Sequence, residues 1–322
     1  EMRDFMREFM IRTDLALEAK EQYEGESGQI KELQGVLVET SFLEGTNGNL
    51  TKVTILNKEG ELALQKPIGT YLTIEAEDLP RSDEDYHSQI SKELSRQLLT
   101  LLPEQTRKSI LVVGLGNREV TPDALGPKVV EHLCITRHIR LANLPTFLKK
   151  EYDISGIVPG VMAQTGMETY EIVKGIVDKT HPTAVLVIDA LAARSTKRLN
   201  TTIQLSDTGI HPGSGVGNHR KALTQETLGV PTISIGVPMV IDAATIVGDT
   251  MEHLITALEE AHMVQGLNQT MEEFEEEDKR QLILELMDER LRKMYVTPKD
   301  IDASVEQISF TISEAINQAF AV

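Results

Sequence analysis

Cysteine, tryptophan and long apolar runs are scarce or absent in this chain of 322 residues. Cys134 is the only cysteine, so the chain can form neither an internal disulfide nor a zinc site built from several cysteines. No apolar run approaches the ~20 residues that a membrane-spanning helix requires, and the first residues lack the apolar core of a signal peptide. We therefore expect a soluble, intracellular protein in which Cys134 is a buried structural thiol.

Positive charge is also in short supply, because 32 Lys and Arg residues stand against 50 Asp and Glu residues. The net charge of −18 repels phosphate backbones, so we expect no direct nucleic-acid partner and no membrane partner. Aromatic residues make up 4% of the chain, so a core has to be built mainly from Val, Ile, Leu, Ala and Met.

Residues 1–14 carry an apolar stripe at helical spacing between charged faces, which predicts an amphipathic helix that docks onto the rest of the chain. We treat these residues as a segment separate from the rest of the chain. The stripe consists of Met2, Phe5, Met6, Phe9 and Met10.

Residues 15–105 are predicted to form an N-terminal lobe, a small β-rich extension with one helix. Strands are expected at 34–40, 50–56 and 70–75, and a helix at 82–102 is ended by Pro103.

Residues 106–264 alternate apolar strands with helices, which is typical of an α/β core. Strands are expected at 109–114, 184–188, 201–205 and 231–236, and helices at 127–136, 167–179 and 242–263. We predict a three-layer α/β sandwich with a mostly parallel central sheet. Residues 265–322 are expected to add C-terminal helices, one of them opened by Thr297 and Pro298.

Two aspartates follow buried strands of this core. Asp123 comes shortly after the strand at 109–114, and Asp189 comes directly after the strand at 184–188. If these strands are parallel neighbours, both carboxyl groups emerge at one edge of the sheet, where ligands bind in open α/β folds. Two close carboxyl groups share a proton, so one can activate water while the other polarises a peptide carbonyl. The simpler alternative for Asp123 is that it caps the following helix.

Two glycine-rich stretches offer other chemistry. Gly114 and Gly116 resemble part of a dinucleotide fingerprint, but Glu119 stands where the third glycine belongs. The loop at 209–218 lacks the Lys-Ser/Thr of a P-loop, and its glycines allow close approach of an extended peptide. The substrate-loop candidates are Gly116, Asn117, His211, Gly213 and Gly215. A structural role for this loop stays open, as does a role without catalysis for His211 and His219, and a serine mechanism through Ser195 or Ser214 is disfavoured.

Several long motifs resemble the germination protease family of spore-forming bacteria. They are RTDLA at 12–16, VVGLGN at 112–117, VTPDALGPK at 120–128, IVPGVM at 157–162, IDALAARS at 188–195 and GIHPGSGVGN at 209–218. The resemblance implies an endopeptidase of the spore core that degrades small acid-soluble spore proteins at germination, acts as a homotetramer and needs no cofactor or metal. Asp123 and Asp189 match the two essential aspartates of the family. The resemblance also implies a fold similar to that of the hydrogenase-maturation endopeptidases.

The family is made as a zymogen that loses a short N-terminal segment. Its substrates are cut after an acidic residue and before an apolar one, in a context like Thr-Glu-Phe-Ala-x-Glu, and residues 13–18 read TDLALE. The resemblance therefore predicts self-cleavage between Asp14 and Leu15, which makes residues 1–14 a pro-segment. A metal-assisted maturation endopeptidase and a nucleotide-binding module built on residues 114–117 remain the rival hypotheses.

Overall fold

The computed structural model describes residues 15–27, 34–43, 45–81, 83–106, 108–142, 152–211, 221–260, 282–283 and 285–320. Within these residues, nine strands form one sheet in the order β1-β2-β3-β7-β8-β6-β4-β5, with β9 paired to β8. The strands are β1 (Val36–Leu43), β2 (Gly48–Ile55), β3 (Gly69–Glu75), β4 (Ser109–Gly114), β5 (Asp153–Ile157), β6 (Ala184–Ala193), β7 (Thr202–Ser206), β8 (Thr232–Asp242) and β9 (Tyr295–Val296).

The sheet is mixed, which corrects the prediction of a mostly parallel sheet. Strands β5, β4, β6 and β8 are parallel to one another. All the other pairings are antiparallel, because β1 to β3 form a meander and β7 runs against both β3 and β8. The β-rich N-terminal region therefore continues the central sheet through the β3–β7 pair.

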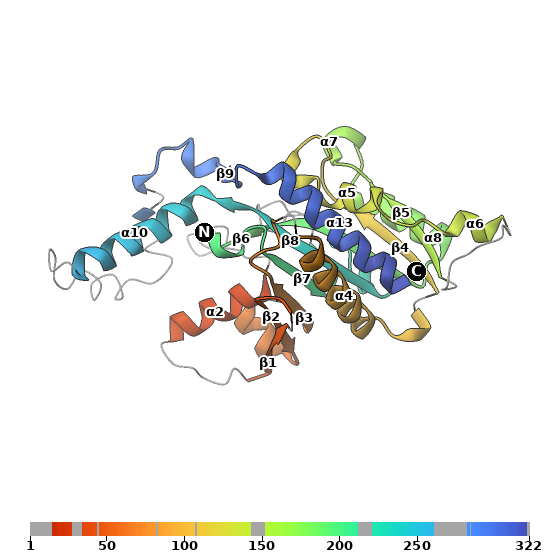
Figure 1. Cartoon of the computed structure of the whole chain (residues 1–322), viewed down its shortest axis with the longest axis horizontal. Coiled ribbons are helices and arrows are strands. Elements are labelled where there is room, and N and C mark those ends of the chain that lie inside the picture. The colour runs from red at the N-terminus through yellow and green to blue at the C-terminus, as the bar shows by residue number, and fades with distance from the viewer. Residues whose placement is uncertain are drawn as a thin grey trace, which may run out of the picture.

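One face of the sheet is covered by α4 (Glu84–Leu101), α5 (Leu125–Glu131) and α13 (Ile301–Phe320). The apolar faces of these helices pack on alternate strand residues such as Val112 and Ile188. Helices α4 and α13 lie side by side across this face (Figure 1), and the Ser91 hydroxyl donates a hydrogen bond of 2.9 Å to the Thr311 carbonyl. Helix α13 begins at Ile301, later than the Thr297–Pro298 pair predicts.

Two groups of helices pack on the opposite face. Helices α8 (Thr169–Thr180) and α9 (Gln225–Leu228) cover the parallel half, where Val113 and Val187 contribute to the core. Helices α2 (Ala16–Ser27) and α3 (Lys58–Leu64) lie over the meander, where Ala16 and Tyr71 share a second core cluster. The sheet surface between these groups forms the cleft described below.

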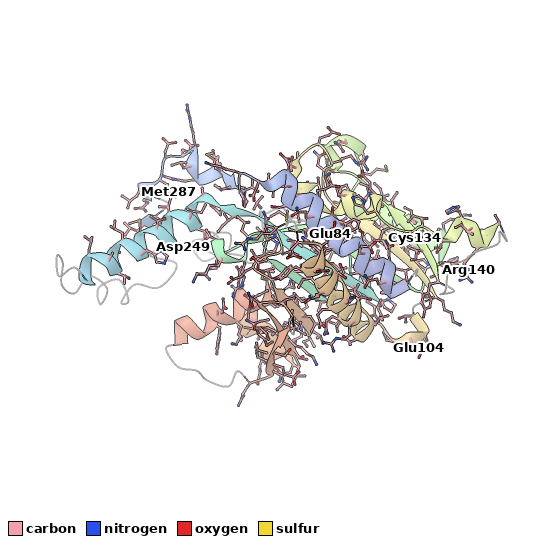
Figure 2. All side chains as sticks on the ribbon, viewed as in Figure 1. Glu84, Glu104, Cys134, Arg140, Asp249 and Met287 are labelled. Atoms are coloured by element: carbon pink, nitrogen blue, oxygen red, sulfur yellow. The ribbon has the colours of Figure 1, made fainter. Side chains whose placement is uncertain are left out.

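Short elements complete the structure. They are α6 (Arg137–Leu141), α7 (Met162–Thr165), and the 3-10 turns η1 (Glu104–Thr106), η2 (Thr121–Asp123), η3 (Thr196–Arg198) and η5 (Leu291–Lys293). Helix α10 (Ala243–Glu260) extends away from the sheet (Figure 1), and Met287 packs against its first turn near Ala243 and Ala244 (Figure 2). No helix among the described residues is long and apolar enough to cross a membrane.

Cys134 is partly buried, whereas the sequence predicted a buried structural thiol. Its neighbours Leu133 and Thr136 are buried, while Cys134 itself packs at the margin of the core cluster. Its backbone N–H donates to Asn317 of α13 at 2.8 Å, so this position ties the end of α5 to the C-terminal helix (Figure 2). Residues 1–14, with the predicted amphipathic helix, lie outside the described residues.

Because α5 lies close to the end of β4, we expect that adding one methyl group at their contact lowers the stability of the fold substantially. A Cβ added at Gly126 would lie 2.4 Å from the Leu115 carbonyl oxygen and 2.5 Å from its nitrogen. We expect Gly126→Ala to lower the free energy of unfolding by about 3 kcal/mol, because backbone must move to admit the methyl group. Gly175 of α8 is the matched control, since nothing lies within 4 Å of its added Cβ. Gly175→Ala should raise stability by about 0.5–1 kcal/mol. Urea unfolding of both variants measures this difference, and equal midpoints would contradict the packing.

Candidate active site at the β4–β6 edge

The centre of the site is the point where β4 stops pairing with β6. The parallel ladder ends with Gly114 beside Ile188, and the Leu115 N–H donates to the Ile188 carbonyl at 2.8 Å. Asp189 is the next residue of β6. The strand continues to Ala193, so Asp189 lies inside the strand and not at its end as predicted. It is nevertheless the first residue of β6 that extends past the last β4 pair, and it is 8% exposed.

Asp123 is brought to the same edge by a tight turn after β4. Gly116 has φ +110°, a conformation that only glycine adopts readily, and the chain then returns so that the Asn117 N–H donates to Asp123 Oδ2 at 2.8 Å. The turn η2, which carries Asp123, contacts both β6 and β8. The residue at the cap position of α5 is Ala124, so Asp123 is not the cap residue of that helix. Strands β4 and β6 are therefore parallel neighbours, which is the condition that the sequence analysis set for bringing the two aspartates to one edge.

Beside Asp189 the sheet face carries polar or small residues. In register, Asp189 pairs with Gly236 of β8, which in turn pairs with Gln204 of β7. Because paired residues of adjacent strands share a face, Asp189 and Gln204 lie on the same side with only a glycine between them, about 10 Å apart. The side chain of Leu191 occupies the space over Gly236, where an added Cβ would lie 2.4 Å from it.

An open cleft lies on this face. Polar side chains of β7 and β8 form its floor, and Lys66 and His211 belong to its rim. Burial, together with the charge of Lys66, lowers the pKa of His211, which favours the neutral imidazole. The lining residues are Lys66, Pro67, Tyr71, Leu191, Gln204, Ser206, Thr208, Gly209, Ile210, His211, Ser234 and Gly236.

Of the predicted loop candidates, the structure places His211 at the cleft, and Gly116 and Asn117 at the Asp123 turn. Gln164 donates from Nε2 to Asn117 Oδ1 at 3.2 Å, which ties the region of α7 to this turn. Gly213 and Gly215 lie outside the described residues, as do His219 and Ser214.

The N-terminal segment contacts the site in a way that sequence reasoning missed. Leu15 and Ala16 are fully buried, and the Ala16 N–H donates to Gln204 Oε1 at 2.7 Å. The Glu18 carboxylate accepts hydrogen bonds from the backbone N–H groups of Arg194 and Ser195, which follow β6. No local pattern marks Glu18, because these partners lie more than 170 positions away in the chain.

Arg198 reinforces this contact. Its guanidinium binds Glu21 through two hydrogen bonds of 2.6 and 2.8 Å, reaches Glu75 at 3.2 Å and lies 3.6 Å from Glu18. Burial opposes the positive charge of Arg198, but the surrounding carboxylates, led by Glu21, outweigh it and raise its pKa above the ordinary value. Ser195 accepts from the Lys197 N–H through its hydroxyl, which caps η3. The contact therefore holds the start of α2 to the end of β6.

The sequence raised two rival chemistries, a metal-assisted peptidase and a nucleotide-binding module. Over the described part of the chain, no three His, Cys, Asp or Glu side chains gather as metal ligands. The glycine turn after β4 is filled by its own chain, since an added Cβ at Gly116 would lie 1.9 Å from the Asp123 carbonyl oxygen. A dinucleotide fingerprint needs open space over its glycines for a pyrophosphate, and this turn does not provide it.

Comparison with known proteins identifies the family. A family model described as germination protease matches residues 13–270. The chain belongs to the germination protease family. A germination protease of Caldanaerobacter subterraneus subsp. tengcongensis is 44% identical over 96% of this chain and 94% of its own length. Those of Clostridium tetani and Bacillus mycoides are 42% and 38% identical, over 96% and 98% of this chain and 95% and 94% of their own lengths. The chain is thus a peptidase of spore germination, which confirms the resemblance.

Among solved structures, a [NiFe] hydrogenase maturation protease of Thermococcus kodakarensis is similar over 44% of this chain and 80% of its own. The sequence identity is 21% and the TM-score is 0.28, a similarity too weak to carry a conclusion about fold or activity.

The glycine turn predicts a loss of activity together with a loss of stability, because an added methyl group at Gly116 would meet the backbone of Asp123. We expect Gly116→Ala to lower peptidase activity by about 10²-fold or more, because the methyl group displaces Asp123. Gly166→Ala is the matched control: Gly166 also has a positive φ of +70°, but nothing lies within 4 Å of its added Cβ. It should keep full activity, because only the modest strain of a left-handed backbone is added there. Circular dichroism and initial rates measure both variants, and full activity of Gly116→Ala would contradict the role of this turn.

Proposed function

We propose that the chain is an aspartate-dependent endopeptidase that starts the degradation of small acid-soluble spore proteins at germination. Asp123 and Asp189 carry the chemistry, and the precursor cuts itself between Asp14 and Leu15. The observation that carries this proposal is the end of the β4–β6 ladder at Gly114 and Ile188, which turns two aspartates far apart in sequence toward one edge of the sheet. Membership of the germination protease family supports a peptidase activity.

In this mechanism the two carboxyl groups share one proton. The ionised carboxylate takes a proton from water as the oxygen attacks the peptide carbonyl, and the protonated carboxyl polarises that carbonyl and then supplies a proton for the leaving amine. Backbone N–H groups orient both side chains: Asn117 donates to Asp123, and Ala190 donates to Asp189 at 3.0 Å. Burial of Asp189 excludes bulk water, which strengthens these interactions.

Self-cleavage is supported by the position of the residues that follow the predicted bond. Leu15 and Ala16 are buried, and the Ala16 N–H is held by Gln204, two strands from Asp189 and on the same face. The chain entering α2 thus passes the level of the proposed catalytic pair. The homotetramer, the spore-core location and the spore-protein substrates follow from the resemblance and belong to the same proposal.

Substitution of either aspartate tests the mechanism. We expect Asp123→Asn and Asp189→Asn each to lower cleavage of a purified small acid-soluble spore protein by at least about 10³-fold, because an amide can neither accept nor release the proton. Asp242→Asn is the matched control: Asp242 ends the neighbouring strand β8 and accepts from the Ala244 N–H at 2.8 Å, which an amide oxygen can replace. Full activity of either active-site variant would end the assignment.

The processing site has its own test. N-terminal sequencing of matured protein should begin at Leu15, and the precursor carrying Asp189→Asn should remain uncut when incubated alone. A mature form that starts at another residue would refute the predicted site. Processing of the Asp189→Asn precursor on its own would show that cleavage does not depend on this aspartate.

A further inference from the structure

One end of the sheet, strand β1, is open along its outer side. Residues 37–42 are all exposed, so neither face of the strand is covered over this stretch. The apolar residues among them are Leu37, Val38 and Phe42, which are 56%, 38% and 65% exposed. Figure 1 shows β1 at the outer margin of the molecule, where β2 is its neighbour in the described sheet. A long exposed edge strand with apolar side chains is prone to pair with another chain.

The opposite end of the sheet, strand β5, carries the features that usually protect an edge. It has five residues and includes Gly156, and Asp153 at its start forms an ion pair of 2.9 Å with Arg140. Strand β1 has eight residues with no Pro, Gly or Lys among them. Its one charged residue, Glu39, lies 3.5 Å from Lys52 of the neighbouring strand β2, so this charge is balanced. The β1 edge is therefore available for pairing, whereas the β5 edge is protected.

The backbone of β1 presents its outward groups at alternate residues. The Leu56 N–H donates to the Gly35 carbonyl at 2.8 Å, which sets the phase of the antiparallel β1–β2 ladder. Odd-numbered residues of β1 therefore bond to β2, and the N–H and C=O groups of Val38, Thr40 and Phe42 point to the open side. Within the described residues, no other strand pairs with β1 on that side.

We propose that β1 is an interface strand, which pairs antiparallel with β1 of a second copy of this chain about a two-fold axis at Thr40. An axis perpendicular to the sheet keeps each side chain on its own face, and one continuous sheet then runs through both copies. The outward groups of residues 38, 40 and 42 exchange hydrogen bonds with those of the second copy. Apolar side chains meet apolar side chains on both faces. The opposed pairs are Thr40 with Thr40, Val38 with Phe42, Leu37 with Leu43, and Glu39 with Ser41.

The order of residues in β1 selects this register and, with it, a second copy as the partner. An axis at Glu39 would set two like charges directly opposite each other, which is destabilising. An axis at Ser41 would set Glu39 opposite Leu43 and Thr40 opposite Phe42, so the apolar pairs are lost. The axis at Thr40 avoids both faults. This inference goes beyond the proposed homotetramer, which names no contact surface, and it does not depend on the aspartate chemistry.

Cysteine cross-linking tests the register. Across the axis the two Thr40 Cα atoms would lie about 5.5 Å apart, a separation that a disulfide spans. Ser41 is the matched control, because it is exposed on the same strand but its two copies would lie on a diagonal of about 8 Å. Under mild oxidation we expect Thr40→Cys to give at least about tenfold more cross-linked dimer than Ser41→Cys. The wild-type chain, whose only cysteine is Cys134, gives the background. Equal yields from both variants, or no dimer from Thr40→Cys, would overturn the proposal.

Light scattering in solution tests the interface itself. Thr40→Pro removes an N–H that points to the open side, so the β1–β2 ladder keeps its bonds while pairing with a second copy is blocked. We expect this variant to have half the mass of the assembled wild-type protein, with an unchanged circular dichroism spectrum. Thr40→Val keeps the N–H and a β-branched side chain, so it should keep the wild-type mass. A monomeric wild-type protein, or an unchanged mass of Thr40→Pro, would refute the interface. Neither measurement uses activity, so failure of the proposed peptidase chemistry would leave both results unaffected.

Discussion

The parallel pairing of β4 with β6 is the constraint on which the rest of the site depends. Apolar residues from Ile110 to Val113 and from Ala184 to Ile188 are buried on both faces of the sheet, so the register of these two strands cannot slip without exposing them. One bond past the ladder, from the Leu115 N–H to the Ile188 carbonyl, closes the pair. The turn to Asp123 starts immediately after it, so core packing fixes where both aspartates stand.

Small side chains next to Asp189 are the second requirement. The residues of β7 and β8 at this level are small, namely Gly236, Ser234 and Ser206. The cleft exists because no large side chain projects from these strands here. Gln204 is the exception, and its amide is used to hold the backbone of Ala16. The chain at the start of α2 therefore covers part of this sheet face, and Leu15 and Ala16 are buried there.

Sequence alone predicted the strands that carry the site, because β4 and β6 are continuous apolar runs with an aspartate after each. It placed Asp189 at a strand end because the run 190–193 consists of Ala and Leu, which suit a helix as well as a strand. The mixed sheet was missed because strand direction depends on pairing with distant strands, and β7 has no local signal that it runs against β8. Strand β5 was not predicted, because Asp153, Ser155 and Gly156 make its composition unfavourable for a strand.

No local sequence pattern predicts the contact of Glu18 with the end of β6. This contact links the zymogen hypothesis to the hypothesis of a catalytic Asp189. A carboxylate that is 2% exposed is stable only if its charge is balanced, and here the balance comes from backbone N–H groups and from Arg198. Those groups follow the same strand that bears Asp189. The strand therefore fixes two things at once, the position of a proposed catalytic carboxyl and the position of the chain that follows the proposed cleavage bond. A shift of β6 by one residue would therefore disturb both the proposed catalytic carboxyl and the contact of Glu18.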